Sequence, residues 1–186
     1  MKHFLSERLI QCPSTLLSQL TAVKPVATAI VAADHPIALD SARQAFDAGV
    51  IQPVLIGGLA KISGAAEHIG WDISSFECIE VNGESEAAEE GARLAHAGSV
   101  NMIMKGHIHT DAFMRPLLAK GSGIRAGRRL SHVFHMSLPD RDDSLLLTDC
   151  ALNVAPDIET RIAIIENAIE LSQKLGCRRP RVALLA

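Results

Sequence analysis

The sequence predicts an α/β fold with three layers, in which helices cover both faces of a mainly parallel β-sheet. Two observations support this fold class. Short apolar runs of strand length recur along the first two-thirds of the chain, and amphipathic segments that end at a glycine separate them. Continuous apolar runs are typical of parallel strands buried on both faces, and their alternation with helices implies right-handed crossovers. After residue 129 the pattern changes, so we expect one α/β domain over residues 1–129 and an incomplete second one over residues 130–186.

The composition fits this fold and excludes several function classes. Of 186 residues, 48% are hydrophobic and 21% are charged, so the chain can bury a sizeable core. A formal net charge of −3 gives no overall attraction to nucleic acid or to an anionic membrane. No apolar run reaches membrane-spanning length, and the N-terminal residues carry charges where a signal peptide needs an apolar core. We expect a cytoplasmic protein with neither membrane nor nucleic-acid partners.

The cysteines predict neither a disulfide framework nor a zinc site. They are far apart, form no Cys-x-x-Cys pair and fit a reducing compartment. None has a histidine partner that the sequence can identify, so a covalent acyl-cysteine intermediate is not expected. The four residues are Cys12, Cys78, Cys150 and Cys177.

The chain begins with two short predicted helices. Apolar residues recur at helical spacing between residues 3 and 21, with an interruption at Pro13. An apolar run over residues 26–32 then predicts a buried strand. A helix over residues 36–46 follows, because a proline suits its first position and Gly49 stops it.

The same strand–helix unit then repeats. Each apolar run is short, and each following amphipathic segment ends at a glycine, as expected for a parallel sheet with crossover helices. The predicted strands cover residues 53–56, 77–81 and 100–104, and the predicted helices cover residues 60–69 and 85–97.

The pattern after residue 129 predicts a β-hairpin. Residues 131–136 and 145–148 are strand-like, and a polar turn over residues 138–143 joins them. A connecting segment follows, and then an amphipathic helix begins. Its apolar stripe is expected to consist of Ile158, Ile162, Ile165 and Ile169.

The last residues, 181–186, are again apolar and strand-like. A buried type of strand at the very terminus, with no cap or tail, favours a truncated second domain. The alternative is a terminal strand that simply completes a sheet.

The strand over residues 100–104 leads into Lys105-Gly106-His107-Ile108-His109-Thr110, which predicts an anion site. Free N–H groups and the positive end of a helix dipole point at whatever lies above such a strand end. Proline costs little only within the first turn of a helix, so Pro116 places the helix start near Ala112. Thr110 and Asp111 then lie in the cap region.

Each polar residue near this turn has a functional and a structural interpretation. His109 is expected to donate a hydrogen bond to substrate, or else to bond the backbone of its loop. Thr110 binds phosphate or caps its helix, and Arg115 contacts the ligand or is an exposed helix charge. His107 and His109 point the same way if the loop is extended, but no third ligand at metal spacing accompanies them, so no metal site is predicted.

Two further groups of candidates lie at the predicted domain boundary or beyond it. Arg128 and Arg129 open the next strand, and we expect one to face a cleft and the other to face solvent. Asp149 and Asn153 lie at a strand end, where α/β clefts bind ligands. Alternatively, Asp149 is structural and accepts hydrogen bonds from backbone N–H groups in its turn.

Several runs of the sequence resemble the phosphate acetyltransferase and phosphate butyryltransferase family. The likeness covers essentially the whole chain and is closest to the butyryltransferase branch and to the domain that follows an enoyl-CoA-hydratase-like module in some bifunctional proteins. The opening segment DHPIALDSARQAFDAGVIQPVLIGG resembles the family's first strand–helix–strand unit. The other runs are MKGHIHTDAFMRPLL, RRLSHVFHMSLP, LLLTDCALNVAPDIETRIAIIENAIEL and KLGCRRPRVALLA.

The resemblance implies transfer of a short acyl group between coenzyme A and inorganic phosphate, which gives an acyl phosphate. It also implies a two-domain fold like that of isocitrate and isopropylmalate dehydrogenases, an active site in the interdomain cleft and a homodimer. Coenzyme A is then a substrate, and no tightly bound cofactor is expected. Family members continue beyond the point that matches Ala186, so the alternative is a catalytically incomplete fragment that binds coenzyme A or phosphate, or only dimerises.

The implied reaction needs an anion site for phosphate, donors for the oxygen of a tetrahedral intermediate, and exchange of the coenzyme A sulfur as a thiolate. We expect direct transfer between bound substrates, with the planar fork of arginine suited to phosphate. A nucleotide-dependent dehydrogenase is a competing class, but no Gly-x-Gly-x-x-Gly follows a strand. The candidate catalytic residues are His109 and Arg115, and the candidate substrate-binding residues are Lys105, Gly106, His107, Thr110, Arg128, Arg129, Ser131, Asp149 and Asn153.

Overall fold

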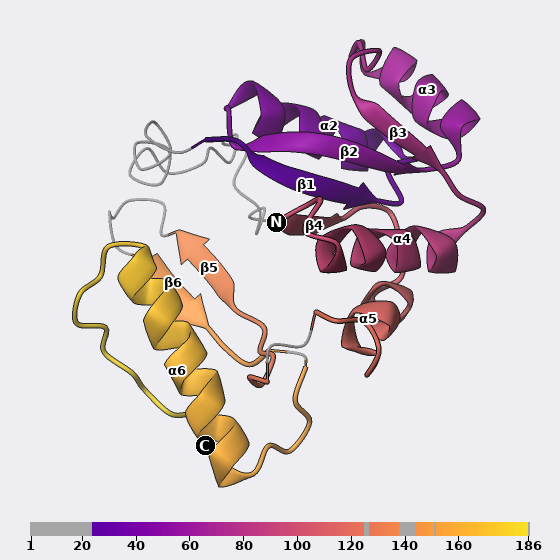
Figure 1. The fold of residues 1–186 in the computed structure, drawn as a ribbon. Helices are drawn as coiled ribbons and strands as arrows, with labels where there is room; N and C mark the ends of the chain where they lie inside the picture. Colours follow the sequence, from indigo (N-terminus) through magenta and orange to yellow (C-terminus); the bar gives the residue numbers. More distant parts are fainter. Residues whose placement is uncertain (1–23, 125–126, 138–143, 151, 186) are drawn as a thin grey trace, which may run out of the picture. The chain divides into compact units, whose positions relative to one another are not determined.

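A computed structural model describes residues 24–124, 127–137, 144–150 and 152–185 (Figure 1). The chain divides into two compact units, and the described residues 24–124 belong to one while those from 127 onward belong to the other. The two helices predicted between residues 3 and 21, and the turn predicted over residues 138–143, lie outside the described residues. Within the described part of the chain, no helix combines the length and apolar character that crossing a bilayer requires.

The first unit is built on a four-stranded parallel sheet. Its strands are β1 (Val26–Val31), β2 (Ile51–Gly57), β3 (Glu77–Glu80) and β4 (Met102–Lys105), in the spatial order β3-β2-β1-β4. At the carboxyl end of β1, Val31 lies opposite Ile56 of β2 and Lys105 of β4. The sheet confirms the predicted α/β fold class, and each strand ends within two residues of its predicted bounds.

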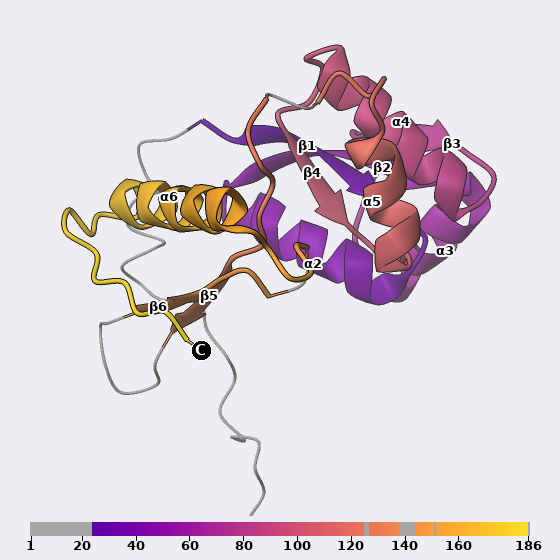
Figure 2. The same cartoon turned by 90° about the horizontal axis from the view of Figure 1, so that it is seen from below.

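Helices cover both faces of this sheet, as the two views in Figures 1 and 2 show. α2 (Pro36–Asp47) and α3 (Leu59–His68) pack on one face, and α4 (Glu84–His96) packs on the other, with α5 (Thr110–Leu118) beside α4. Neighbouring residues of β1 point to opposite faces, so Ile30 joins one core cluster and Val31 joins the other. The bounds of α2, α3 and α4 agree with the prediction to within one residue.

α4 approaches the sheet closely because Gly91 faces β1. A Cβ at this position would lie 2.6 Å from Cγ2 of Val31, which is far inside van der Waals contact. Buried alanines on the same face, including Ala87 and Ala88, let the rest of α4 approach the sheet closely as well. The small residues of α4 therefore set its distance from the sheet.

The prediction that the helix after β4 begins near Ala112 is wrong. α5 begins at Thr110, its N-cap is His109, and Pro116 lies inside the helix rather than in the first turn. The backbone N–H of His109 donates to the carboxylate of Glu84 at 3.0 Å, so a residue of α4 stabilises the earlier start. The missing N–H of Pro116 falls near the other end, since α5 ends at Leu118.

The second unit contains a β-hairpin and a long helix. β5 (Phe134–Ser137) and β6 (Ser144–Leu147) pair in antiparallel fashion, which confirms the predicted hairpin. The strand predicted at the end of the chain is not formed, because residues 181–185 have no regular secondary structure and pair with no strand in the described part. An apolar run becomes a strand only where a neighbour offers a hydrogen-bonding edge.

The helix of this unit, α6 (Ile158–Lys174), lies alongside the hairpin in both views (Figures 1 and 2). The side chain of Asp157 caps it by accepting from the N–H of Thr160 at 2.8 Å. The expected apolar stripe is only partly covered: Ile158 and Ile162 are 76% and 51% exposed, whereas Thr160 and Ile164 are buried. Residues two positions apart lie on nearly opposite sides of a helix, so α6 buries the face across from the expected stripe.

Candidate functional site

The carboxyl edge of the parallel sheet is where the first unit gathers polar residues. β1 is followed by the loop to α2, and β4 by the loop to α5; these two strands are neighbours although they are far apart in sequence. The strand order reverses at β1, since β2 and β3 lie on one side of it and β4 on the other. Such a reversal at the carboxyl edge is the usual ligand site of open α/β sheets.

Gly106 joins these two loops through the backbone. Its N–H donates to the carbonyl oxygen of Val31 at 2.8 Å, and the N–H of His107 donates to that of Ala32 at 3.1 Å. A Cβ at Gly106 would collide with both carbonyl oxygens, so only glycine fits. Ala32 itself has a φ of +54°, in the left-handed region, which costs a non-glycine residue about 1 kcal/mol.

His107 stacks on His35 from the β1–α2 loop. The ring centroids are 4.2 Å apart and the planes differ by 15°. His35 is also the N-cap of α2, because its Nδ1 accepts from the N–H of Ile37 at 3.2 Å. The two loops on either side of the strand reversal are therefore joined by side chains as well as by backbone.

His109 does not take part in this ring stack. It contacts Glu84, the first residue of α4. Its Nδ1 lies 3.2 Å from Oε1 and 3.1 Å from Oε2 of the carboxylate, which also accepts the His109 backbone N–H. The hydrogen bonds from the backbone and then the side chain of His109 hold the pKa of Glu84 below its ordinary value. Glu84 is thus an ionised acceptor facing the candidate catalytic histidine.

A cavity of about 530 Å³ lies at this edge of the sheet. Of the candidate residues, only His107 lines it. The other polar lining is mixed in charge, since Lys61 lies 3.8 Å from Asp34 and Glu80 accepts the N–H of Leu59 at the start of α3. The remaining lining includes the residues Ala32, Gly57, Gly58, Asn82, Gly83 and Glu84. The cavity lining offers more carboxylate acceptors than cationic groups, and Lys105, which is exposed, does not line it.

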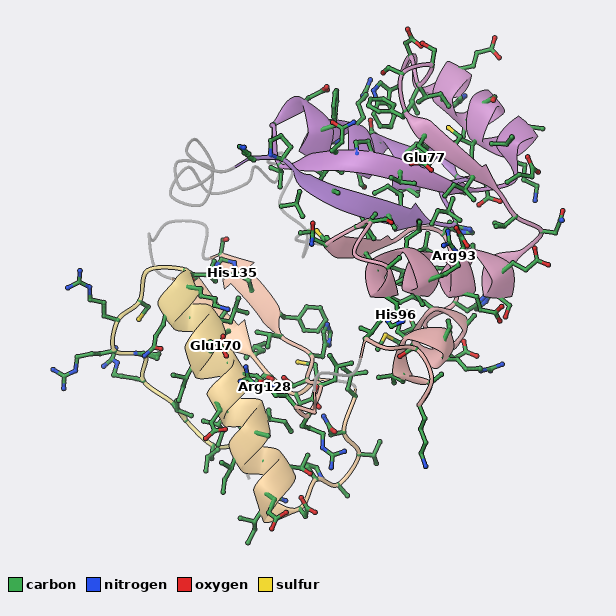
Figure 3. The ribbon with its side chains drawn as sticks, viewed as in Figure 1. Glu77, Arg93, His96, Arg128, His135 and Glu170 are labelled. Carbon is green, nitrogen blue, oxygen red and sulfur yellow. The ribbon has the colours of Figure 1, made fainter. Side chains whose placement is uncertain are left out.

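Arg115 lies on α5 and faces a different cavity, of about 500 Å³, between α4 and α5. Its side chain is 78% exposed, and its guanidinium lies 3.6 Å from the carboxylate of Asp111 one turn earlier. Arg93 and His96 line the same cavity from the end of α4 (Figure 3). The structure therefore does not bring Arg115 and His107 into one cavity.

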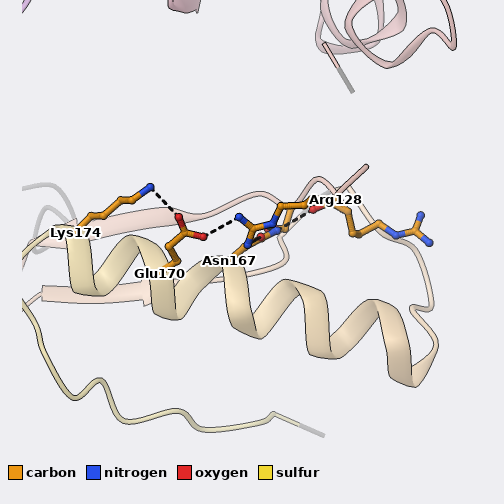
Figure 4. A network of polar contacts seen from close by, with 6 residues as sticks. Arg128, Asn167, Glu170 and Lys174 are labelled. Atoms are coloured by element: carbon orange, nitrogen blue, oxygen red, sulfur yellow. Dashed lines mark hydrogen bonds and ion pairs between the residues drawn. The ribbon is translucent and has the colours of Figure 1, made fainter. Parts of the chain in front are cut away.

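In the second unit, a polar network centred on Asn167 of α6 includes the candidate residues Arg128, Arg129 and Ser131 (Figure 4). The Asn167 amide nitrogen donates to the carbonyl oxygen of Arg129 at 2.8 Å and to Oγ of Ser131 at 2.9 Å. The amide oxygen accepts from Arg128 at 3.2 Å. Ser131 is thus occupied as an acceptor within its own unit.

The two neighbouring arginines differ in what their guanidinium groups do. Arg128 reaches α6 and pairs with Glu170 at 2.9 Å, and Lys174 lies 2.8 Å from the same carboxylate (Figures 3 and 4). Hydrogen bonds from Lys174 and then Arg128 hold the pKa of Glu170 below its ordinary value. The Arg129 side chain, by contrast, is exposed and makes no hydrogen bond or ion pair with the described residues, although its charge helps to lower the pKa of Asp157.

Asp149 is held by the backbone around it. Its carboxylate accepts from the N–H of His132 at 2.8 Å and of Asn153 at 2.9 Å, and also from the Asn153 side chain. Burial alone would raise the pKa of Asp149, but the hydrogen bonds from the Asn153 side chain and from these N–H groups lower it below its ordinary value. The Asn153 amide donates onward to the carbonyl oxygen of Leu130 at 3.0 Å. This geometry matches the structural interpretation of Asp149.

Three residues at these sites were not found from the sequence: Glu84, His35 and Asn167. His35 precedes Pro36, a pattern that marks a helix start but not a ring stack. Glu84 and Asn167 act on partners 25 and 38 residues away, at spacings that no local pattern encodes. In the described part of the chain, no three His, Cys, Asp or Glu side chains gather closely enough to hold a metal ion.

The parallel sheet, the strand reversal and the polar loops at its carboxyl edge define a ligand-binding α/β protein. The chain belongs to the phosphate acetyl/butaryl transferase family, because residues 84–186 match the sequence model of that family.

Individual relatives agree with this family. The chain is 36% identical over 177 residues to a phosphate acetyltransferase of Rhizobium meliloti, covering 94% of this chain and 56% of the relative. It is 35% identical over 170 residues to a phosphate butyryltransferase of Clostridium beijerinckii, covering 90% of this chain and 56% of the relative. The chain spans about half the length of the curated relatives that it matches.

Solved structures confirm the fold class. A branched-chain phosphotransacylase from Enterococcus faecalis aligns with a TM-score of 0.64 and 27% identity, covering 81% of this chain and 52% of the other. The EutD phosphotransacetylase from Staphylococcus aureus aligns with a TM-score of 0.69 and 20% identity, covering 88% and 57%.

Proposed function

We propose that this chain supplies the acyl-CoA and phosphate sites of a phosphate acyltransferase, which exchanges a short acyl group between coenzyme A and inorganic phosphate. One observation carries the proposal. The region that matches the family, residues 84–186, contains both the loop after β4, at the strand reversal, and the arginine pair that opens the second unit. The proposal includes two domains, over residues 1–129 and 130–186, a reaction in the cleft between them, and a cytoplasmic homodimer.

The chemistry is a direct transfer. A phosphate oxygen attacks the thioester carbonyl carbon, a tetrahedral intermediate forms, and the carbon–sulfur bond breaks to release the coenzyme A thiolate. The acyl carbon ends on the phosphate oxygen, and the thiolate takes up a proton. Donors aimed at the intermediate's oxygen lower the barrier most effectively when they are already in place. Hydrogen bonds to the end of β1 fix the backbone of the loop after β4, but they use the N–H groups of Gly106 and His107, so the expectation of free N–H groups there is wrong and the donors to substrate in this proposal are side chains.

Arg129 is the better of the two arginines for phosphate. Its guanidinium makes no hydrogen bond to the described residues, while its backbone carbonyl is fixed by Asn167. Arg128 is already paired with Glu170, so binding phosphate would require breaking that contact. A free guanidinium on a fixed backbone can meet two phosphate oxygens at once.

Lys105, Gly106, His107 and Thr110 form the other half of the phosphate site in this proposal. Lys105 contributes charge from the last residue of β4, and Gly106 lets the backbone approach β1 closely. Thr110 is the first residue of α5, where N–H groups at a helix start favour an anion. Arg115 is then a residue that contacts the coenzyme, since it faces a separate cavity.

The proposal is tested by measuring thiol release from acetyl-CoA and butyryl-CoA with a thiol-reactive dye, with and without inorganic phosphate. Phosphate-dependent release is expected, and Arg129→Ala should suppress it while Glu166→Ala, an exposed change on α6, should not. The preferred acyl chain follows from the same measurement.

A second candidate is favoured by the fact that the chain spans about half of its relatives. In that case, the chain binds coenzyme A or phosphate, or only dimerises, without turnover. A folded sample that shows no release but binds coenzyme A in calorimetry would establish this candidate and refute the enzymatic one.

A further inference from the structure

His35 and His107 lie in the loops that follow two neighbouring strands, β1 and β4. Their rings stack, with centroids 4.2 Å apart and planes 15° from parallel. The backbone of His107 is held separately, because its N–H donates to the carbonyl oxygen of Ala32 at 3.1 Å. The hydrogen bond therefore fixes the backbone of His107, and the stack fixes the orientation of its ring.

We propose that His35 is a positioning residue that holds the imidazole of His107 in the orientation in which it contacts bound phosphate. This inference rests on the proposed acyltransferase function, in which His107 belongs to the phosphate site, and deepens it. His35 itself does not contact the ligand, so its whole effect passes through His107.

The cap of α2 alone does not require a histidine. His35 is the N-cap of this helix, and its Nδ1 accepts from the N–H of Ile37 at 3.2 Å. Asparagine, aspartate and serine are the preferred residues at such a position, because a short side-chain oxygen reaches the same N–H groups. What the imidazole adds is the face of a ring, and that face packs against His107.

The cap also holds the ring of His35 in place. Its Nδ1 must point at the N–H of Ile37, which lies in the first turn of a 12-residue helix. The ring of His35 cannot turn without losing this hydrogen bond. The ring of His107 is therefore stacked on a support that α2 fixes.

His107 is the member of the pair that reaches the ligand. It is exposed and lines the cavity at the carboxyl edge of the sheet, whereas His35 is half-buried and does not line it. Neither ring nitrogen of His107 has a hydrogen-bond partner among the described residues, so the ring can donate to a phosphate oxygen. A side chain that is already oriented loses little conformational freedom when the ligand binds.

His35→Asn tests the positioning role, because asparagine keeps the cap and removes the ring. Relaxation of ¹³C-labelled histidine rings should show a well-ordered His107 ring in wild type and a more mobile one in the variant. The KM for phosphate should rise about three-fold to ten-fold, since the ring must then be ordered on binding, and kcat should change by less than about two-fold. Circular dichroism checks that the variant is folded.

A double-substitution cycle tests whether His35 acts through His107. His107→Ala should raise the KM for phosphate about ten-fold or more, because a hydrogen bond to a charged group is lost. Adding His35→Asn to His107→Ala should then have no further effect on this KM.

His68→Asn is the matched control. It makes the same chemical change at an exposed histidine in the last turn of α3, which has no hydrogen bond or ring contact with the described residues. Its substitution should leave the order of the His107 ring and the KM for phosphate unchanged.

Three results would overturn the inference: a His107 ring that is equally mobile in wild type and His35→Asn, a more mobile ring with an unchanged KM for phosphate, or a further rise of this KM in the double variant. Absence of phosphate-dependent turnover in wild type is a different failure, which refutes the proposed function. The relaxation measurement then still decides whether His35 fixes the ring, and a phosphate titration of the His107 ring signals decides whether that ring contacts phosphate.

Discussion

The side-chain amide of Asn167 donates a 2.8 Å hydrogen bond to the backbone carbonyl oxygen of Arg129. This bond joins α6 to the segment before β5, and the same amide group also contacts Ser131 and Arg128. This side chain therefore ties to α6 the start of a run that has no regular secondary structure.

Asn167→Ala removes all three of these contacts. We expect the free energy of unfolding to fall by about 1 to 2 kcal/mol, because each hydrogen bond contributes about 1 kcal/mol and the group is partly exposed. Urea unfolding followed by circular dichroism measures the change. Glu166→Ala, one residue earlier on the same helix, is the control; an equal loss in both variants would contradict a specific role for the amide.

Arg129→Ala and Arg128→Ala should separate ligand binding from structure. Arg129→Ala should raise the KM for phosphate about ten-fold or more, since a charge-assisted contact to phosphate is lost. Arg128→Ala should change this KM little, because its guanidinium is already paired with Glu170. Initial rates at varied phosphate concentration give both values. A larger effect from Arg128 would reverse the assignment.

Gly106→Ala should destabilise the first unit, because its Cβ would collide with two carbonyl oxygens of the β1 end. The expected loss is about 1 to 3 kcal/mol, as for other overpacked sites. Thermal unfolding tests this against Gly64→Ala in α3, where a new Cβ meets nothing within 4 Å. The Gly64 variant should be neutral or more stable by up to about 1 kcal/mol. Similar behaviour of the two variants would show that the close approach does not matter.

Asp149 should make the stability of the second unit depend on pH. Its pKa is lowered in the folded state, so its contribution is fully present above the unfolded-state pKa and is lost as the pH falls through the folded-state pKa. The difference in unfolding free energy between wild type and Asp149→Asn should be constant near neutrality and shrink in the acid range below about pH 4. Urea unfolding at a series of pH values measures it. A difference that stays the same at every pH would contradict the carboxylate's role.

The parallel sheet and its helices were predictable because their signals are local. Each apolar run, each glycine stop and the proline at the start of α2 act within a few residues. The start of α5 was not predictable in this way. Thr110 becomes helical because Glu84, from another helix, accepts the N–H of the preceding residue.

The buried face of α6 is a second feature that the sequence pattern did not predict. Its sequence has isoleucines on two sides, at 158 and 162 and again at 164, and periodicity alone does not say which side is covered. The different contacts of the two arginines were not predictable for the same reason. Arg128 and Arg129 are chemically identical side chains, and they differ only because Glu170 of α6 lies beside Arg128. Tertiary contacts, which no local pattern encodes, decide which of these side chains are already paired.

The stacked rings of His35 and His107 have a consequence for the evolution of this sheet edge. A ring pair of this kind contributes about 0.5 to 1.5 kcal/mol beyond its buried area, and either ring alone contributes none of that. Selection therefore acts on the two positions jointly, although they lie in loops that follow strands not consecutive in the chain. Among homologous sequences, substitution at residue 35 should be accompanied by substitution at residue 107, so that both imidazoles are kept or lost together.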